Sequence, residues 1–207
     1  AIELTRFAES ADATAALVVT PYYNKPTQEG LYQHYKAIND NCSIPIIIYN
    51  IPGRSVVDMK VDTMARLFEL KNIVGVKDAT GDLERASEQK KKMGKEFIML
   101  TGNDENAYEF NRRGGVGCIS VSSNVVPKLC SEFQNFSNNG NHIDAKNLFD
   151  KLLDLHNVMF VESNPVPAKY SLQLLSMMKD EVRLPLVTAS EDSKKKINKV
   201  LKNLSII

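Results

Sequence analysis

Residues 73–81 read Ile-Val-Gly-Val-Lys-Asp-Ala-Thr-Gly, an apolar run that carries one lysine, Lys77, and ends in a turn. The run predicts a buried strand, and the Thr-Gly-Asp sequence at 80–82 predicts the start of a helix. Lys77 is therefore expected at the carboxyl end of a strand, where the chain turns into a helix. Because an ammonium is costly to bury, we expect a lowered pKa and a populated neutral amine, which a lysine needs to attack a carbonyl and form a Schiff base.

The rest of the chain repeats this pattern of a short apolar strand followed by a helix. Five strands are expected, with ends near residues 20, 49, 77, 101 and 119, and none alternates apolar with polar residues. Such alternation of strand and helix predicts a parallel sheet, and unbroken apolar strands predict burial on both faces. A doubly wound sheet and a (β/α)8 barrel both fit. No Gly-rich dinucleotide fingerprint, which would favour the doubly wound sheet, follows a strand.

Polar side chains at the strand ends favour the barrel, because the carboxyl ends of barrel strands form the catalytic face. These residues are Tyr22, Tyr23, Tyr49, Asn50, Arg54, Lys77, Thr80 and Asn103. We therefore predict an α/β fold of the (β/α)8 TIM-barrel type with about five βα units present. Five strands do not close an eight-stranded barrel, so either three strands precede them or the sheet is open. The chain starts without Met inside a helical pattern, so we expect a piece of something longer.

The last part of the chain has a helical pattern. After Pro127, which fits a first helical turn, helices are expected over about 142–159, 166–178 and 190–204. We predict a partial barrel domain over residues 1–140 and a C-terminal helical domain over 141–207.

Composition excludes several classes of function. The 207 residues carry 26 Lys+Arg and 25 Asp+Glu, so the net charge of +1 gives no reason to expect a nucleic-acid or membrane partner. The chain shows no signal peptide and no apolar stretch long enough to span a bilayer. Three cysteines without metal-like spacing favour reduced thiols in the cytoplasm. The histidines, which have no partner at ligand spacing, predict no metal.

Three residues at the predicted catalytic face could act together. Lys77 would be the nucleophile, Tyr49 at the preceding strand end could move protons, and the guanidinium of Arg54 suits a carboxylate substrate. Each has a plainer alternative: a lysine extending to solvent, an aromatic at a strand end, and a loop arginine. No carboxylate pairs with Lys77 in this pattern, since Asp78 should point to the opposite face of the strand.

Tyr22 and Tyr23 are adjacent, so both cannot face the same site. One could serve the pocket and the other a contact between subunits.

Several motifs together resemble the dihydrodipicolinate synthase family, within the N-acetylneuraminate lyase superfamily. The motifs, in chain order, are Thr-Pro-Tyr-Tyr-Asn-Lys-Pro at 20–26, Tyr-Asn-Ile-Pro-Gly-Arg at 49–54, Gly-Val-Lys-Asp-Ala-Thr-Gly at 75–81, Gly-Asn-Asp at 102–104, Gly-Gly-Val-Gly-Cys-Ile-Ser-Val at 114–121 and Phe-Val-Glu-Ser-Asn-Pro-Val-Pro-Ala-Lys at 160–169. The resemblance covers essentially the whole chain, although the lysine motif alone is shared by the wider group of pyruvate aldolases.

The resemblance implies a lyase of lysine (diaminopimelate) biosynthesis that condenses pyruvate with L-aspartate 4-semialdehyde to 4-hydroxy-tetrahydrodipicolinate. It implies a homotetramer, built as a dimer of dimers, or a dimer, and no cofactor beyond a pyruvate imine on Lys77. By the same resemblance, Tyr49 relays protons and Arg54 holds the semialdehyde carboxylate. Tyr23 reaches the partner's site, Tyr22 lies at the lysine-inhibitor cleft, and the backbone carbonyl of Ile119 lines the pyruvate site.

One departure from the family pattern is the absence of the first three βα units. In the family they carry the Thr-Thr motif and the acidic residue of the inhibitor cleft. Two alternatives therefore stand beside the leading one: another pyruvate-dependent class I aldolase such as N-acetylneuraminate lyase, against which Arg54 argues, and an inactive truncated barrel fragment.

Overall fold

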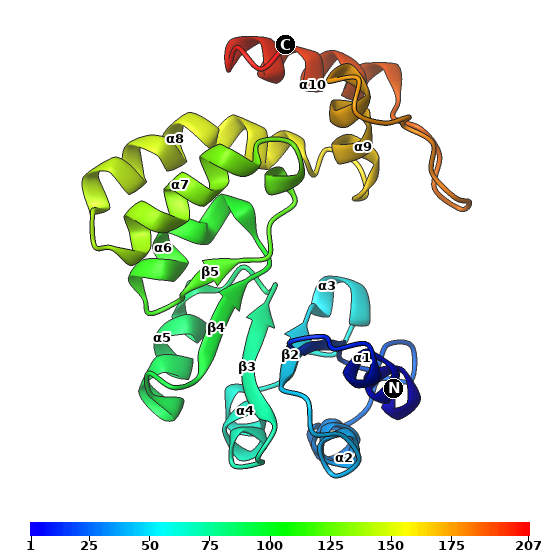
Figure 1. The fold of residues 1–207 in the computed structure, drawn as a ribbon, viewed down its shortest axis with the longest axis vertical. Helices are drawn as coiled ribbons and strands as arrows, with labels where there is room; N and C mark the ends of the chain where they lie inside the picture. The colour runs from blue at the N-terminus through cyan, green and yellow to red at the C-terminus, as the bar shows by residue number, and fades with distance from the viewer. The chain divides into compact units, whose positions relative to one another are not determined.

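Five parallel strands form one sheet in the order in which they occur in the chain. The computed structural model describes all 207 residues, and Figure 1 shows the strands as arrows. They are β1 (Ala16–Val19), β2 (Ile46–Asn50), β3 (Ile73–Asp78), β4 (Ile98–Thr101) and β5 (Gly117–Cys118). A doubly wound sheet reverses its strand order at a switch point, whereas this order has no reversal. The sheet is therefore wound in one direction, as in a (β/α)8 barrel.

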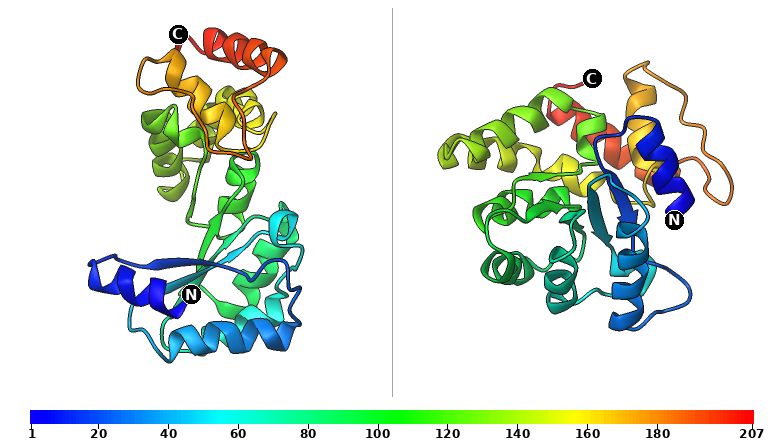
Figure 2. Two further views of the ribbon diagram at one scale, coloured as in Figure 1. Left: turned by 90° about the vertical axis from the view of Figure 1, so that its right-hand side faces the viewer. Right: turned by 60° about the horizontal axis from the view of Figure 1, so that its bottom comes forward.

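The helices of this part form a single layer outside the strands. α2 (Gln28–Asn39) packs on α4 (Val61–Phe68), α4 on α5 (Leu83–Met93), and α5 on α6 (Ala107–Arg112). Figure 1 and the right-hand view of Figure 2 show these helices as an arc around the strands. The shorter elements are α1 (Ile2–Ser10), α3 (Pro52–Ser55) and η1 (Asp104–Asn106).

Local sequence signals set the helix ends. The Thr27 side chain accepts a hydrogen bond from Gly30 N at the start of α2, and Asp82 accepts one from Glu84 N at the start of α5. α5 ends at Gly94, whose φ of 75° suits a residue without Cβ. Both caps, and the end of α5 at Gly94, confirm the sequence predictions.

Burial in the strands alternates, which corrects the prediction of strands buried on both faces. In β2, Ile46, Ile48 and Asn50 are completely buried under the helices, whereas Ile47 and Tyr49 are half-buried. The same alternation leaves Leu17 of β1 44% exposed. An apolar sequence shows that a strand can be buried, but the packing of each face decides which side chains are.

The chain divides into two units, Ala1–Ile119 and Ser120–Ile207. The second unit consists of η2 (Ser122–Asn124), α7 (Pro127–Asn138), α8 (His142–Val158), α9 (Val166–Leu174) and α10 (Glu191–Asn203). α7 packs on α8, and α10 packs on α8 and α9. The predicted helical character of this part is confirmed. The domain boundary predicted at residue 140 stays a prediction, because a division by contacts does not show which segments fold together.

Two predicted elements are longer than the observed ones. The strand expected over 116–121 is regular only at Gly117–Cys118, because Val121 has helical backbone angles and begins the turn into η2. The helix expected over 166–178 ends at Leu174, shortly before Ser176 adopts a left-handed φ of 57°. No helix in the structure combines the length and the apolar composition that a membrane span requires.

Candidate active site

Lys77 and Tyr49 are partners in the register of β3 and β2, so both side chains leave the same face of the sheet. The Lys77 Nζ atom lies 4.1 Å from the centre of the Tyr49 ring. This face is the one that the helices do not cover. The structure therefore brings together the amine and the phenol that the sequence predicted as partners.

The environment of Lys77 favours the neutral amine. Burial lowers the pKa of Lys77 below its ordinary value of 10.5, and the charges of Cys118 and Asp104 oppose this shift more weakly. The side chain is half-buried, and it runs past Gly102 at the end of β4. A Cβ on Gly102 would lie 3.0 Å from Lys77 Cε, so this glycine leaves the space through which the lysine stem passes.

Tyr49 keeps its proton at neutral pH. Burial raises the pKa of its phenol above the ordinary value of 10.0, and the positive charge of Arg54 opposes that shift. Arg54 belongs to the short helix α3, directly after β2, and its side chain is exposed. The predicted turn after β2 is therefore one helical turn, which places a cation near the phenol.

The remaining predicted site residues lie at the surface. Tyr23 is 89% exposed and has a left-handed φ of 68°, which is unusual for an aromatic residue. Tyr22 is 67% exposed and lines a surface pocket together with residues of α1 and β1. Ile119 is 37% exposed, and its amide donates to the carbonyl of Thr101 at 3.0 Å. No hydrogen bond or ring contact joins these three side chains to Lys77 or Tyr49. Their predicted roles therefore stay predictions.

The sequence reasoning missed two groups near Lys77. Asp104, which is 3% exposed in η1, and Cys118 in β5 both raise the pKa of Lys77 and so oppose the effect of burial. Cys118 Sγ lies 3.9 Å from Asp104 Oδ1. Asp104 follows β4, the strand next to that of Lys77, and Cys118 lies in β5, one strand further along the sheet. Their positions in or after predicted strands could be read from the sequence. Their nearness to Lys77 could not, because it depends on the order of the strands in the sheet.

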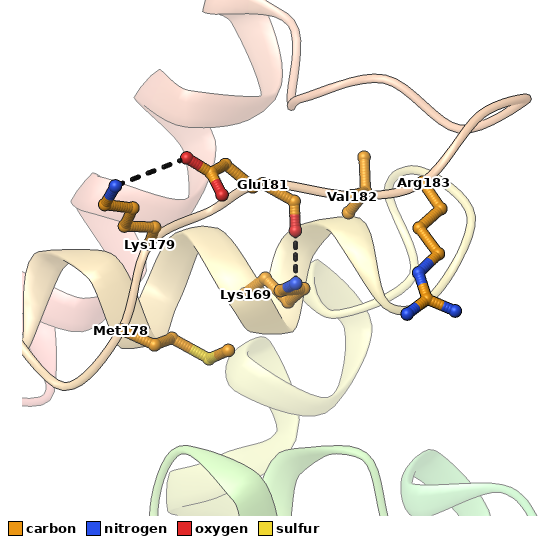
Figure 3. Close-up of a pocket in the computed structure, with 6 residues that line it drawn as sticks. All are labelled: Lys169, Met178, Lys179, Glu181, Val182 and Arg183. Carbon is orange, nitrogen blue, oxygen red and sulfur yellow. Dashed lines mark hydrogen bonds and ion pairs between the residues drawn. The ribbon is translucent and has the colours of Figure 1, made fainter.

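Another pocket lies wholly in the second unit, between α9 and the segment after it (Figure 3). Lys169 donates to the backbone carbonyl of Glu181, and the Glu181 carboxylate pairs with Lys179 at 3.6 Å. None of the predicted site residues lines this pocket.

The sequence matches the model of the dihydrodipicolinate synthetase family over residues 1–204. This chain belongs to the dihydrodipicolinate synthetase family. It is 63% identical over 210 residues to the 4-hydroxy-tetrahydrodipicolinate synthase of Pelagibacter ubique, an alignment that covers 100% of this chain and 72% of that protein. The resemblance found in the sequence is thereby confirmed.

Solved structures of this family share the fold. The Acinetobacter baumannii enzyme, described as chloride-inhibited and complexed with pyruvate, matches with a TM-score of 0.97 at 45% identity, over 100% of this chain and 71% of that one. A dihydrodipicolinate synthase described as the first monomeric variant matches with a TM-score of 0.95 at 41% identity, over 100% of this chain and 70% of that one. The (β/α)8 barrel assignment and the assignment as a lyase of lysine biosynthesis follow from this family membership.

Proposed function

We propose that this chain forms a Schiff base between Lys77 and pyruvate, in the condensation of pyruvate with L-aspartate 4-semialdehyde to 4-hydroxy-tetrahydrodipicolinate. The observation that carries the proposal is the pair of Lys77 and Tyr49, with the amine 4.1 Å from the ring centre and its pKa lowered by burial. A neutral amine is the nucleophile that imine formation needs. The names of the relatives and the pyruvate complex of one of them support the substrates.

The chemistry requires proton transfers that a phenol can make. Lys77 Nζ attacks the keto carbon of pyruvate, and the resulting carbinolamine loses its hydroxyl as water to give the imine. The departing hydroxyl must gain a proton, and the nitrogen must lose one. Tyr49 retains its proton at neutral pH and lies beside the amine, so we assign it this relay.

The other predicted residues take supporting roles in the proposal. Arg54 binds the carboxylate of the semialdehyde, since an exposed guanidinium next to Tyr49 suits an incoming anion. The Ile119 carbonyl lines the pyruvate site. The imine on Lys77 takes the place of a cofactor, and we assign the reaction to the cytoplasm.

Tyr23 and Tyr22 are proposed to act between subunits of a homotetramer. An 89% exposed aromatic side chain on a strained backbone is expected where another chain covers it. Tyr23 would then complete the partner's site, and Tyr22 would lie at the inhibitor cleft.

Reductive trapping tests the proposal. Incubation of the purified protein with pyruvate and borohydride is expected to give one covalent adduct on Lys77, located by peptide mass spectrometry. Lys77→Ala is expected to give none. Lys71→Ala, which removes an exposed lysine just before β3, is the control and should keep the adduct. Absence of any adduct in the wild-type protein would contradict the proposed chemistry.

A further inference from the structure

The residues that follow Tyr49 and Lys77 in their strands lie on the opposite face of the sheet, under the helices. These residues, Asn50 and Asp78, are partners in the register of β2 and β3, and they are 0% and 3% exposed. Their polar side chains are therefore buried directly behind the two proposed catalytic residues.

The buried carboxylate of Asp78 has four donors. Arg85 Nε donates at 3.2 Å and Gln89 Nε2 at 2.8 Å, both to Oδ2. The amide and hydroxyl of Thr80 donate to Oδ1 at 3.0 and 2.7 Å. These bonds tie the end of β3 to helix α5 and to the turn between them.

Arg85 connects this carboxylate to the end of β2. Its Nη2 donates to the carbonyl of Met59 at 2.8 Å, and its Nη1 pairs with Asp58 Oδ2 at 3.3 Å. Asn50 completes the connection, since its amide group donates to Asp58 Oδ1 at 2.8 Å and its side-chain oxygen accepts from Met59 N at 3.0 Å. One guanidinium thus bridges the residue after Lys77 and the partners of the residue after Tyr49.

The backbone extends the connection to the lysine stem. Ala79 N donates to the carbonyl of Asn50 at 2.9 Å, and Gly102 N donates to the carbonyl of Asp78 at 2.7 Å. Gly102 is the residue that lies against Lys77 Cε. A displacement of Asp78 would therefore move Lys77 and the glycine that shapes its path together.

We propose that Arg85, with Asp78, Asp58 and Asn50, is a positioning network that holds Lys77 against Tyr49 from behind the sheet. Asn50 and Asp78 point away from the substrate face, because alternate residues of a strand point to opposite faces, and Arg85 reaches Asp78 from helix α5. Buried ion pairs commonly contribute little to stability compared with apolar residues of similar volume. The network is therefore better explained by the geometry it imposes on the strand ends than by stability. The inference rests on the proposed role of Lys77.

The test compares Arg85→Met with Lys92→Met in the purified protein. Both residues lie on α5 and pair with an acid outside that helix, but the Lys92 pair with Asp62 is exposed. The readout is the single-turnover rate of pyruvate adduct formation, trapped with borohydride. Arg85→Met is expected to lower this rate by about 10- to 100-fold, as an error of about 1 Å in position would. Lys92→Met is expected to keep the wild-type rate.

A double variant separates positioning from folding. Arg85→Met/Asp78→Asn removes both buried charges, so its melting temperature is expected to recover relative to Arg85→Met, while its adduct rate stays low. Arg85→Lys should restore part of the rate. Wild-type adduct rates in Arg85→Met or in the double variant would overturn the inference.

A crystal structure of Arg85→Met tests the positioning network without relying on adduct formation, and therefore independently of the proposed function. A wild-type protein without adduct would contradict the proposed function alone. In that case a changed separation of Lys77 Nζ and the Tyr49 ring in Arg85→Met supports the network, and a separation still at 4.1 Å overturns it.

Discussion

Lys77 lies between the Tyr49 ring on one neighbouring strand and Gly102 at the end of the other. The proposed reactivity of Lys77 would have two sources: burial, which lowers the pKa, and these two neighbours, which would fix the direction of the amine. A substitution at Tyr49 or Gly102 should therefore change the position of the Lys77 amine while the lysine itself stays in place in the sequence.

Gly102→Ala tests whether Gly102, on the side of Lys77 away from Tyr49, confines the lysine side chain. The new methyl group would lie 2.8 Å from Ala79 Cβ and 3.0 Å from Lys77 Cε, so the backbone near Ala79 must shift and the lysine stem must give way slightly. We expect the rate of adduct formation with pyruvate to fall by about 10-fold, less than the roughly 100-fold effect of a displacement of about 1 Å. Gly53→Ala is the matched control, since a Cβ there meets nothing within 4 Å. Equal rates in the two variants would show that Gly102 does not confine Lys77.

At this scale the sequence predicted the chemical groups better than their surroundings. Lys77, Tyr49 and Arg54 could be proposed as site residues because each follows an apolar run or a Pro-Gly turn. The influence of Asp104 and the bridging by Arg85 were not predicted. Both depend on which elements are neighbours in space, and local patterns do not contain that information.

At the scale of elements, β3 packs unusually closely against β4. A Cβ on Gly75 would lie 2.2 Å from the carbonyl oxygen and 2.6 Å from the Cβ of Ile98. Backbone atoms of a central strand cannot yield as a flexible side chain can, so only glycine fits at this position. β3 must stay in register with both neighbours for Lys77 to face Tyr49.

Gly75→Ala is therefore expected to destabilise the fold by about 1–3 kcal/mol, the usual cost of overpacking, or more. The measurement is urea unfolding followed by circular dichroism. Gly117→Ala in β5 is the comparison, because its methyl group would meet only the tip of Leu100 at 3.3 Å. If Gly75→Ala proved no less stable than Gly117→Ala, the close packing of β3 on β4 would be refuted.

The order and type of the elements could be predicted because periodicity and capping residues are local. Thr27, Asp82 and Gly94 each mark a helix end at the expected position. The two-residue length of β5 and the exposure of Leu17 could not be predicted, since they depend on backbone angles after Ile119 and on which face of β1 is covered.

At the scale of the whole molecule, the proposal needs two chains. Tyr23 is assigned to the partner's site, and one family member is described as monomeric. An oligomer with Tyr23 acting between chains therefore needs a functional test.

Mixed oligomers provide that test. Tyr23→Phe and Lys77→Ala should each have little condensation activity alone. In a two-fold dimer, a mixed pair keeps one site with Lys77 from one chain and Tyr23 from the other. Co-expression in equal amounts should therefore restore about a quarter of wild-type activity, since about half of the pairs are mixed. Activity no higher than the sum of the two variants would place Tyr23 outside the partner's site.

The most direct test of the account is the trapping of pyruvate on Lys77 as a function of pH. Because the pKa of Lys77 is lowered, the neutral amine increases as pH rises through a midpoint below 10.5. Adduct formation should follow that curve, with the modification located at Lys77 and absent from Lys77→Ala. An adduct at a different lysine, or a midpoint at or above 10.5, would contradict the assignment of Lys77 as the buried nucleophile.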